Sequence, residues 1–391
     1  MASPSEHARD ARIAAATCVL AGLAALAVAL PAVWWESLHV DEATTLEYAS
    51  HRFTAIVEDT FVERGGGPLS FFVEKATLWF PGGIEGLRGP SVLFFLAALP
   101  FAWLVGRRLV GVAQACALVF LLALAPLAVP LVTFARPYTP LLLGTLLAAW
   151  LSLRAADDPS RGRWIAAGVV AGLLPYVHPI APLYAVLAFA TGPLASRLSL
   201  REAARRAVPG AVALVVVALP YAYALAVLRR RYHVGYGDSG LLGTTHGRSV
   251  PEEALRGLAP DGLAGALLLA ALAVLGLVLL WRSRRGAAIA LALWIVVPVA
   301  FFTLVPVGGT RFFDRYLLPM LPAYLLLVAT GCFGARAVGR VRLAVGGAAI
   351  LGLLAWQALD ASQRLRDLHA EQLPELVSAI PDGRPVLFAA T

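Results

Sequence analysis

Eleven apolar runs, separated by short polar segments, constrain the fold of this chain more than any other feature. Most are close to the roughly 20 residues that an α-helix needs to cross the hydrocarbon core of a bilayer. Only 14% of the residues are charged, whereas a soluble domain carries about 25%. We therefore predict an all-α polytopic membrane protein with about 11 spans. The runs cover approximately residues 13–33, 89–106, 109–131, 137–153, 164–177, 179–196, 208–228, 262–281, 286–305, 316–334 and 343–359.

The distribution of arginines predicts the orientation of the chain. With the N-terminus inside, the inner segments hold 17 of the 32 Lys and Arg residues but only 5 of the 24 Asp and Glu residues. Such an excess of basic residues is typical of cytoplasmic loops. We therefore predict an integral protein of the plasma (inner) membrane, with a cytoplasmic N-terminus and an extracytoplasmic C-terminus. The inner segments lie at residues 6–12, 107–108, 154–163, 197–206, 282–285 and 336–342.

Two parts of the chain are distinguished by their composition. Residues 1–359 are expected to form one transmembrane module, whose first long outer loop covers about residues 34–88. Within this loop, residues 67–80 are apolar but too short to span, which predicts a juxtamembrane helix along the membrane surface. Residues 360–391 are polar and are predicted to lie outside. They end in a turn and the first residues of a strand, so the chain either stops there or continues into a soluble domain.

Two adjacent carboxylates, Asp41 and Glu42, follow the first apolar run. A carboxylate at the mouth of a membrane cavity is suited to act as a general base for a hydroxyl nucleophile. It is equally suited to bind a hard divalent metal ion. The alternative is that the pair only marks the beginning of a helix, where acidic side chains are favoured.

Arg136 and His178 each lie between two apolar runs on the predicted outer side. The guanidinium group of Arg136 either anchors the chain at the membrane interface or holds a phosphate, which arginine binds in bidentate fashion. His178, which is flanked by two nearby prolines, is either a hydrogen-bonding group at the interface or a ligand for a substrate or metal.

A third group of charged and aromatic residues falls in a late outer segment that contains Arg311, Asp314, Arg315 and Tyr316. These residues form either an ion pair at the interface or part of a binding site. The single topology places this group on the same face as the acidic pair and Arg136. Carboxylates and arginines at one membrane face suit a substrate that brings together a phosphate and a hydroxyl nucleophile.

Four stretches in this order resemble a known superfamily. They are HVDEATTLEYAS at 39–50, GGGPLSFFVEKATLW at 65–79, FARPYTPLLL at 134–143 and DRYLLPMLPAY at 314–324. Together they resemble the GT-C superfamily of glycosyltransferases that use polyprenyl-phosphate sugars, and are similar to protein O-mannosyltransferases and lipid A aminoarabinose transferases. The resemblance implies a GT-C-like bundle of transmembrane helices, with juxtamembrane helices in the first outer loop.

The resemblance also implies a role for each matching residue. Asp41 would be the catalytic carboxylate that takes the proton of the acceptor hydroxyl, and Glu42 would assist it or contact the acceptor. Arg136 and Arg315 would hold the lipid phosphate, and Tyr138 would shape the pocket. Further candidates for accessory roles are Glu63, as a second loop acid, with His178, Arg311 and Tyr316. Because attack is assisted by one base without a protein nucleophile, the sugar is expected to be transferred with inversion.

The implied partners are a polyprenyl-phosphate-linked hexose or pentose and a glycan, lipid or protein acceptor, without nucleic acid. A divalent metal ion remains open, because the sequence has GGGP at residues 65–68 where many relatives carry a His or a second Pro. The rival interpretation is a lipid or solute transporter or flippase without glycosyl transfer. A transferase requires Asp41, Arg136 and Arg315 to face one outward cavity, whereas a transporter favours charged groups near the middle of the membrane.

Overall fold

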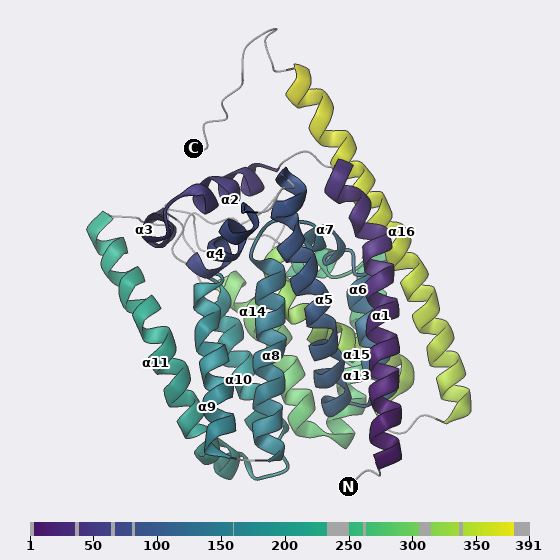
Figure 1. Cartoon of the computed structure of the whole chain (residues 1–391). Coiled ribbons are helices and arrows are strands. Elements are labelled where there is room, and N and C mark those ends of the chain that lie inside the picture. Colours follow the sequence, from purple (N-terminus) through teal and green to yellow (C-terminus); the bar gives the residue numbers. More distant parts are fainter. Residues whose placement is uncertain are drawn as a thin grey trace.

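The computed structural model describes residues 4–35, 39–63, 67–79, 83–158, 160–232, 250–260, 263–304, 314–335 and 339–378. Regular structure in these ranges is entirely helical, and the long helices pack side by side in a bundle (Figure 1). This confirms the predicted all-α class. The long helices are α1 (Pro4–Trp35), α5 (Gly83–Leu109), α8 (Tyr138–Asp157), α11 (Leu200–Tyr232), α13 (Leu263–Ser283), α14 (Arg285–Leu304) and α16 (Arg340–Ser378).

Eight helical segments in the described ranges are long and apolar enough to cross a membrane: the seven long helices above, and residues 314–333, where the 3₁₀ turn η2 (Asp314–Met320) leads into α15 (Leu321–Phe333). The chain is therefore an integral membrane protein. Three predicted runs form shorter helices, so 11 crossings stay a prediction. These are α6 (Val112–Ala123), α9 (Arg161–Leu173), which continues into the 3₁₀ turn η1 (Leu174–Tyr176), and α10 (Ala181–Ala195).

Basic residues from several of the predicted inner segments meet at one end of the bundle. At the end where α1 begins, Arg107 of α5 pairs with Asp10, with 2.6 Å between the nitrogen and oxygen atoms, and Arg108 pairs with Asp157 at the end of α8. The opposite end carries α2 (Val40–Ser50), α3 (Phe53–Glu63), α4 (Pro68–Thr77) and α7 (Val129–Val132) (Figure 1). The orientation of these ends in the cell remains a prediction.

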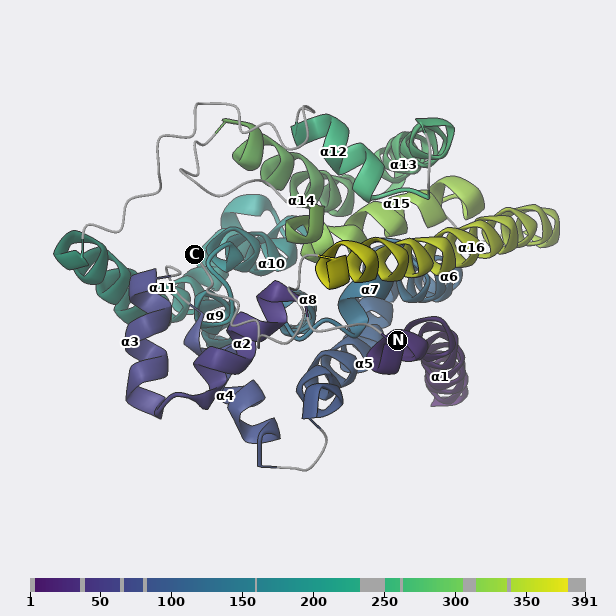
Figure 2. The ribbon, with the colours of Figure 1, turned by 90° about the horizontal axis from the view of Figure 1, so that it is seen from above.

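Helices α2 to α4 form a cap over part of this opposite end of the bundle, which is called the capped end below. The predicted juxtamembrane helix is α4, and Lys75 ties it to the end of α2 by donating to the carbonyl oxygens of Ala49 at 3.1 Å and His51 at 2.7 Å. Viewed from above, α3 lies beside α11 and α4 beside α5 (Figure 2). A short helix, α12 (Val250–Gly257), packs against α14 and η2. The cap thereby covers the ends of helices that are distant in the sequence.

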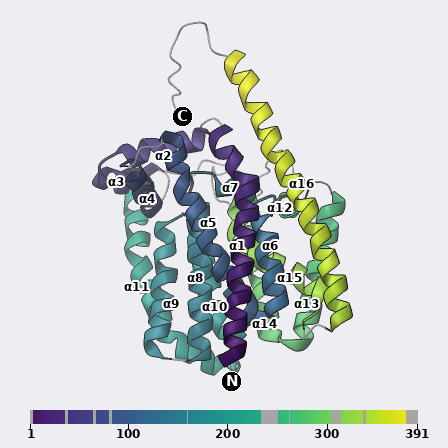
Figure 3. The same ribbon diagram turned by 45° about the vertical axis from the view of Figure 1, so that its right-hand side comes forward.

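Helix α16 crosses the predicted boundary at residue 360 without a break. It continues to Ser378 and extends beyond the neighbouring helices at the capped end (Figure 3). The first polar residues of the expected C-terminal segment are therefore helical. The turn and strand predicted for its last residues lie outside the described ranges.

Candidate functional site

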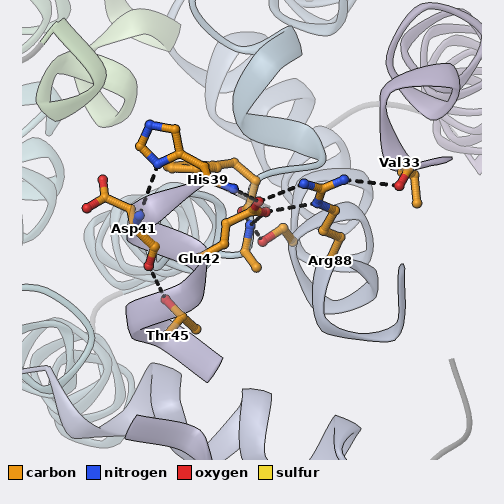
Figure 4. A network of polar contacts seen from close by, with 9 residues as sticks. Val33, His39, Asp41, Glu42, Thr45 and Arg88 are labelled. Carbon is orange, nitrogen blue, oxygen red and sulfur yellow. Dashed lines mark hydrogen bonds and ion pairs between the residues drawn. The ribbon is translucent and has the colours of Figure 1, made fainter. Parts of the chain in front are cut away.

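The acidic motif lies at the beginning of α2, where a capping box fixes its geometry. The Nδ1 atom of His39 accepts a hydrogen bond from the backbone N–H of Asp41 at 3.0 Å. The backbone N–H of His39 in turn donates to Glu42 at 3.2 Å. This reciprocal pairing satisfies N–H groups that a helix leaves without partners in its first turn. The side chains of Asp41 and Glu42 consequently leave the helix in different directions (Figure 4).

Glu42 is held in a buried ion pair with Arg88 of α5. The Nε and Nη2 atoms of Arg88 lie 2.9 and 2.7 Å from the two carboxylate oxygens, and both side chains are only 1% exposed. The backbone N–H of Ala135 donates to the same carboxylate at 3.0 Å, and Arg88 also donates to the carbonyl of Val33 at 3.0 Å (Figure 4). These contacts show that protein donors surround the carboxylate of Glu42. Its predicted role, to assist Asp41 or to contact the acceptor, stays a prediction.

Asp41 contacts both arginines that are predicted to hold the phosphate, Arg315 through its carboxylate and Arg136 through its backbone carbonyl. Its Oδ2 atom lies 3.0 Å from Nη2 of Arg315, which comes from η2, and each side chain is about one-fifth exposed. The Nη1 atom of Arg136 lies 3.4 Å from both the carbonyl oxygen of Asp41 and the hydroxyl of Thr45. A carboxylate and two guanidinium groups, from three separate parts of the chain, therefore meet at the capped end of the bundle.

Aromatic rings form a wall beside Arg315. Its guanidinium carbon lies 5.9 Å from the ring centre of Phe134 and 5.7 Å from that of Tyr138, within the range of cation–π attraction. Behind it, Tyr138 contacts the rings of His178 at 5.4 Å and Tyr316 at 6.4 Å. The predicted residues Tyr138, His178 and Tyr316 thus form one aromatic cluster next to the charged groups.

His178 is buried and uncharged at neutral pH. Burial, followed by the positive charges of Arg136 and Arg315, lowers its pKa to about 3. Its Nδ1 atom accepts a hydrogen bond from the backbone N–H of Ile180 at 3.2 Å. In the described ranges, His, Cys, Asp and Glu side chains do not gather in groups of three or more that could hold a metal ion. The neutral imidazole is therefore better suited to packing and hydrogen bonding than to binding a phosphate.

The glycine at position 67, in the GGGP sequence where many relatives carry a His or a second Pro, has a structural reason. Gly67 lies directly before α4. Gly67 has a φ of +95°, and a Cβ atom placed there would lie 2.8 Å from the carbonyl oxygen of Val177. Only glycine adopts this conformation readily and also leaves room for the neighbouring backbone. The beginning of α4 is thereby brought against the segment that carries His178.

Glu74 of α4 belongs to the same site and was not among the residues predicted from the sequence motifs. The side chain is buried, and burial raises the pKa of its carboxyl well above 4.5 against the opposing effect of Arg136. Among the described residues, neither Oε2 of Glu74 nor Nε of Arg136 has a hydrogen-bond partner. Buried polar atoms normally have partners, so the site has unused capacity to bind a polar group. The available signal was a single acid within the apolar sequence LSFFVEKATLW.

Replacing Glu74 with glutamine should change the pH dependence of stability. The free energy of unfolding of the variant, relative to that of the wild type, should increase as the pH rises. Above about pH 4.5 the unfolded chain loses a proton that the folded chain retains, so the free energy of unfolding of the wild type falls as the pH approaches the raised pKa. The variant lacks this proton. Thermal unfolding in detergent between about pH 5 and 9 measures the difference, and Glu47→Gln on the exposed part of α2 is the control. A difference that does not grow with pH would contradict the raised pKa.

The structure does not describe the side chains of two predicted accessory residues, Glu63 and Arg311. Glu63 is the last residue of α3, but its side chain lies outside the described part of the structure. Arg311 lies outside the described ranges altogether. Their roles remain predictions from the sequence.

Comparison with known proteins agrees with the motifs. The family model described as dolichyl-phosphate-mannose-protein mannosyltransferase matches residues 69–223, which include all of α4 except Pro68, and also Arg136. No curated protein sequence matches the chain.

Solved structures of low sequence identity share the fold. The apo oligosaccharyltransferase of Archaeoglobus fulgidus is 15% identical, with a TM-score of 0.60, and the match covers 90% of this chain and 56% of that one. ArnT from Cupriavidus metallidurans bound to undecaprenyl phosphate is 15% identical, with a TM-score of 0.54 and coverage of 94% and 72%. This chain thus spans just over half the length of the oligosaccharyltransferase. These similarities confirm the resemblance that the motifs indicated, and the chain has a GT-C membrane fold.

Proposed function

We propose that this chain is an inverting glycosyltransferase that moves a sugar from a polyprenyl-phosphate carrier to a hydroxyl acceptor at the outer face of the membrane. The observation that carries the proposal is the meeting of Asp41 with Arg136 and Arg315 at the capped end of the bundle. The match to the mannosyltransferase family model supports the same reaction class. ArnT with undecaprenyl phosphate, and an archaeal oligosaccharyltransferase with dolichol-phosphate, support a lipid-linked donor.

The proposed reaction is a single displacement. The acceptor hydroxyl gives its proton to the carboxylate of Asp41, while its oxygen attacks the anomeric carbon of the sugar. The bond between that carbon and the phosphate oxygen breaks, and the electron pair leaves with the polyprenyl phosphate. One displacement without a covalent enzyme intermediate inverts the configuration at the anomeric carbon.

The arginines have two tasks in this reaction. Guanidinium groups stabilise the negative charge that develops on the leaving phosphate, a type of electrostatic stabilisation that is large in partly buried sites. Arg315 also pairs with Asp41, and its five N–H donors allow it to hold a carboxylate and a phosphate oxygen together. The same side chain therefore links the base to the leaving group.

The position of the charged groups favours transfer over transport. Asp41 belongs to α2 and Glu74 to α4, which lie at one end of the bundle rather than midway along the long helices (Figure 1), and Arg136 contacts Asp41 there. Transporter sites are typically near the bilayer midplane, between related halves of the chain.

The direct test is transfer by the purified chain in lipid nanodiscs. Polyprenyl-phosphate mannose, arabinose and aminoarabinose would be offered separately, with envelope glycans, lipids and peptides as acceptors. Product analysis by mass spectrometry and NMR should find a sugar joined with inverted configuration. Movement of lipid phosphates across vesicles, with no transfer from any donor, would favour the transporter instead.

Replacing Arg136 with alanine should mainly impair use of the donor. We expect the KM for the polyprenyl-phosphate sugar to rise about tenfold or more, since a charge-assisted hydrogen bond contributes about 1.5–3 kcal/mol. The KM for the acceptor should change little. Arg52→Ala removes an exposed arginine at the same end of the molecule and serves as the control. An unchanged KM for the donor would remove Arg136 from the phosphate site.

A further inference from the structure

A second concentration of basic groups lies at the end of the bundle opposite Asp41. Four arginines from three helix junctions line a cavity of about 280 Å³. Arg108 is at the end of α5, Arg197 follows α10, and Arg284 and Arg285 lie where α13 passes into α14. The proposed transfer reaction uses none of these residues.

Hydrogen bonds hold this cavity together at the level where the transmembrane helices end. The Nη1 atom of Arg284 donates to the carbonyl oxygens of Arg108 at 3.3 Å and Leu109 at 3.2 Å. Arg108 also pairs with Asp157, the last residue of α8. The cavity is therefore built between helix ends, at the membrane face that the arginine pattern assigns to the cytoplasm.

Positive charge in the cavity is only partly compensated. Within the described ranges, Asp157 is the one acidic residue that pairs with any of the four arginines. Partial burial lowers the pKa of Arg284, and the neighbouring charges of Arg108 and Arg197 lower it further. Like charges held this close repel one another, so a bound anion would stabilise the arrangement.

The beginning of α14 adds a second source of positive potential. Gly286 and Ala287 line the cavity and belong to the first turn of this 20-residue helix. The first hydrogen bond across that turn runs from Ala288 N–H to the carbonyl of Arg284. The preceding N–H groups have no acceptor within the helix, and such helix beginnings attract phosphates and other anions.

We propose that this cavity is a phosphate-binding site that holds the headgroup of an anionic membrane lipid. The guanidinium group of an arginine can bind phosphate through two parallel N–H···O hydrogen bonds. Basic pockets between transmembrane helices on the cytoplasmic side bind the headgroups of anionic lipids. The volume is slightly below the roughly 300 Å³ at which small-molecule pockets begin, which suits a headgroup whose acyl chains remain in the bilayer. A soluble phosphate has the same chemistry and is distinguished by experiment.

The test measures lipid binding to the full chain by native mass spectrometry, with phosphatidylglycerol or phosphatidylcholine added to the detergent. The pocket variant is Arg197→Gln with Arg285→Gln, because both side chains are exposed and Arg284 keeps its structural hydrogen bonds. The wild type should retain phosphatidylglycerol preferentially, and the variant should bind it about tenfold more weakly or worse. The control is Arg205→Gln with Arg340→Gln, which removes the same charge from exposed positions at the same end.

Each outcome decides the proposal. Loss of phosphatidylglycerol in the pocket variant alone supports it. Inorganic phosphate that binds the wild type, but not the pocket variant, and displaces no lipid would keep the phosphate site and overturn the lipid assignment. Equal retention of both lipids, or an equal loss in the control variant, would overturn the site itself. Thermal unfolding in phosphatidylcholine verifies that each variant is folded, and because no sugar transfer is measured, the result is independent of the proposed enzyme activity.

Discussion

Replacing Asp41 with asparagine should abolish sugar transfer while the chain remains folded in the membrane. Asparagine has the size of aspartate but does not accept the proton of the acceptor hydroxyl. A positioned general base contributes about 10²- to 10⁴-fold to a rate, so we expect kcat to fall by at least 100-fold. The ion pair with Arg315 is partly exposed, and pairs of this kind contribute at most about 1 kcal/mol to stability.

The measurement is initial-rate kinetics with a defined polyprenyl-phosphate sugar, together with donor binding to the same preparation. Donor affinity should stay close to that of the wild type, which separates this variant from Arg136→Ala. Glu47→Gln, on the exposed part of α2, is the matched control and should keep full activity. Activity close to that of the wild type in Asp41→Asn would eliminate Asp41 as the base.

Replacing Arg88 with methionine should produce the largest loss of stability among these variants. The change leaves the buried carboxylate of Glu42 without its ion-pair partner, and breaking one side of such a pair costs about 3–5 kcal/mol. It also removes the bond to the carbonyl of Val33. We expect a clear fall in the thermal unfolding temperature and a parallel loss of transfer, because the beginning of α2 loses its attachment to α5.

A double variant separates the charge effect from the loss of packing. Combining Arg88→Met with Glu42→Gln removes both charges while an amide oxygen still accepts from the N–H of Ala135. The double variant should recover much of the stability that Arg88→Met alone loses. Arg163→Met is the control, since its pair with Asp158 is exposed and contributes little. An unfolding temperature of Arg88→Met equal to that of the control would refute the structural role of the pair.

The sequence predicted those parts of the fold that depend on local composition. Apolar length alone located the long helices, and the short apolar stretch at residues 67–80 correctly indicated α4. The charge pattern also indicated that Asp41, Arg136 and Arg315 would meet, because one topology placed them at one face. The extension of α16 to Ser378 was missed, since the residues after 360 are too polar to be recognised by hydropathy.

Contacts between distant segments were beyond such reasoning. Glu42 and Arg88 are 46 positions apart, and no periodicity connects them. The sequence suggested that Glu42 assists Asp41 or contacts the acceptor, but it gave no indication of the protein donors that surround its carboxylate. Glu74 was overlooked for a related reason: its neighbours are apolar, and its proximity to Arg136 arises from the way α4 lies against the bundle.

The ion pair of Glu42 with Arg88, and the hydrogen bonds around it, have a consequence for biosynthesis. Their donors and acceptors come from Val33, His39, Arg88 and Ala135, which leave the ribosome one after another. The beginning of α2 is therefore locked only after the segment around residue 135 has been delivered to the membrane. Until then, Asp41 belongs to a loop whose contacts with the rest of the bundle are incomplete. A nascent chain arrested before that point would have a membrane anchor, but the proposed base Asp41 would lie next to neither Arg136 nor Arg315.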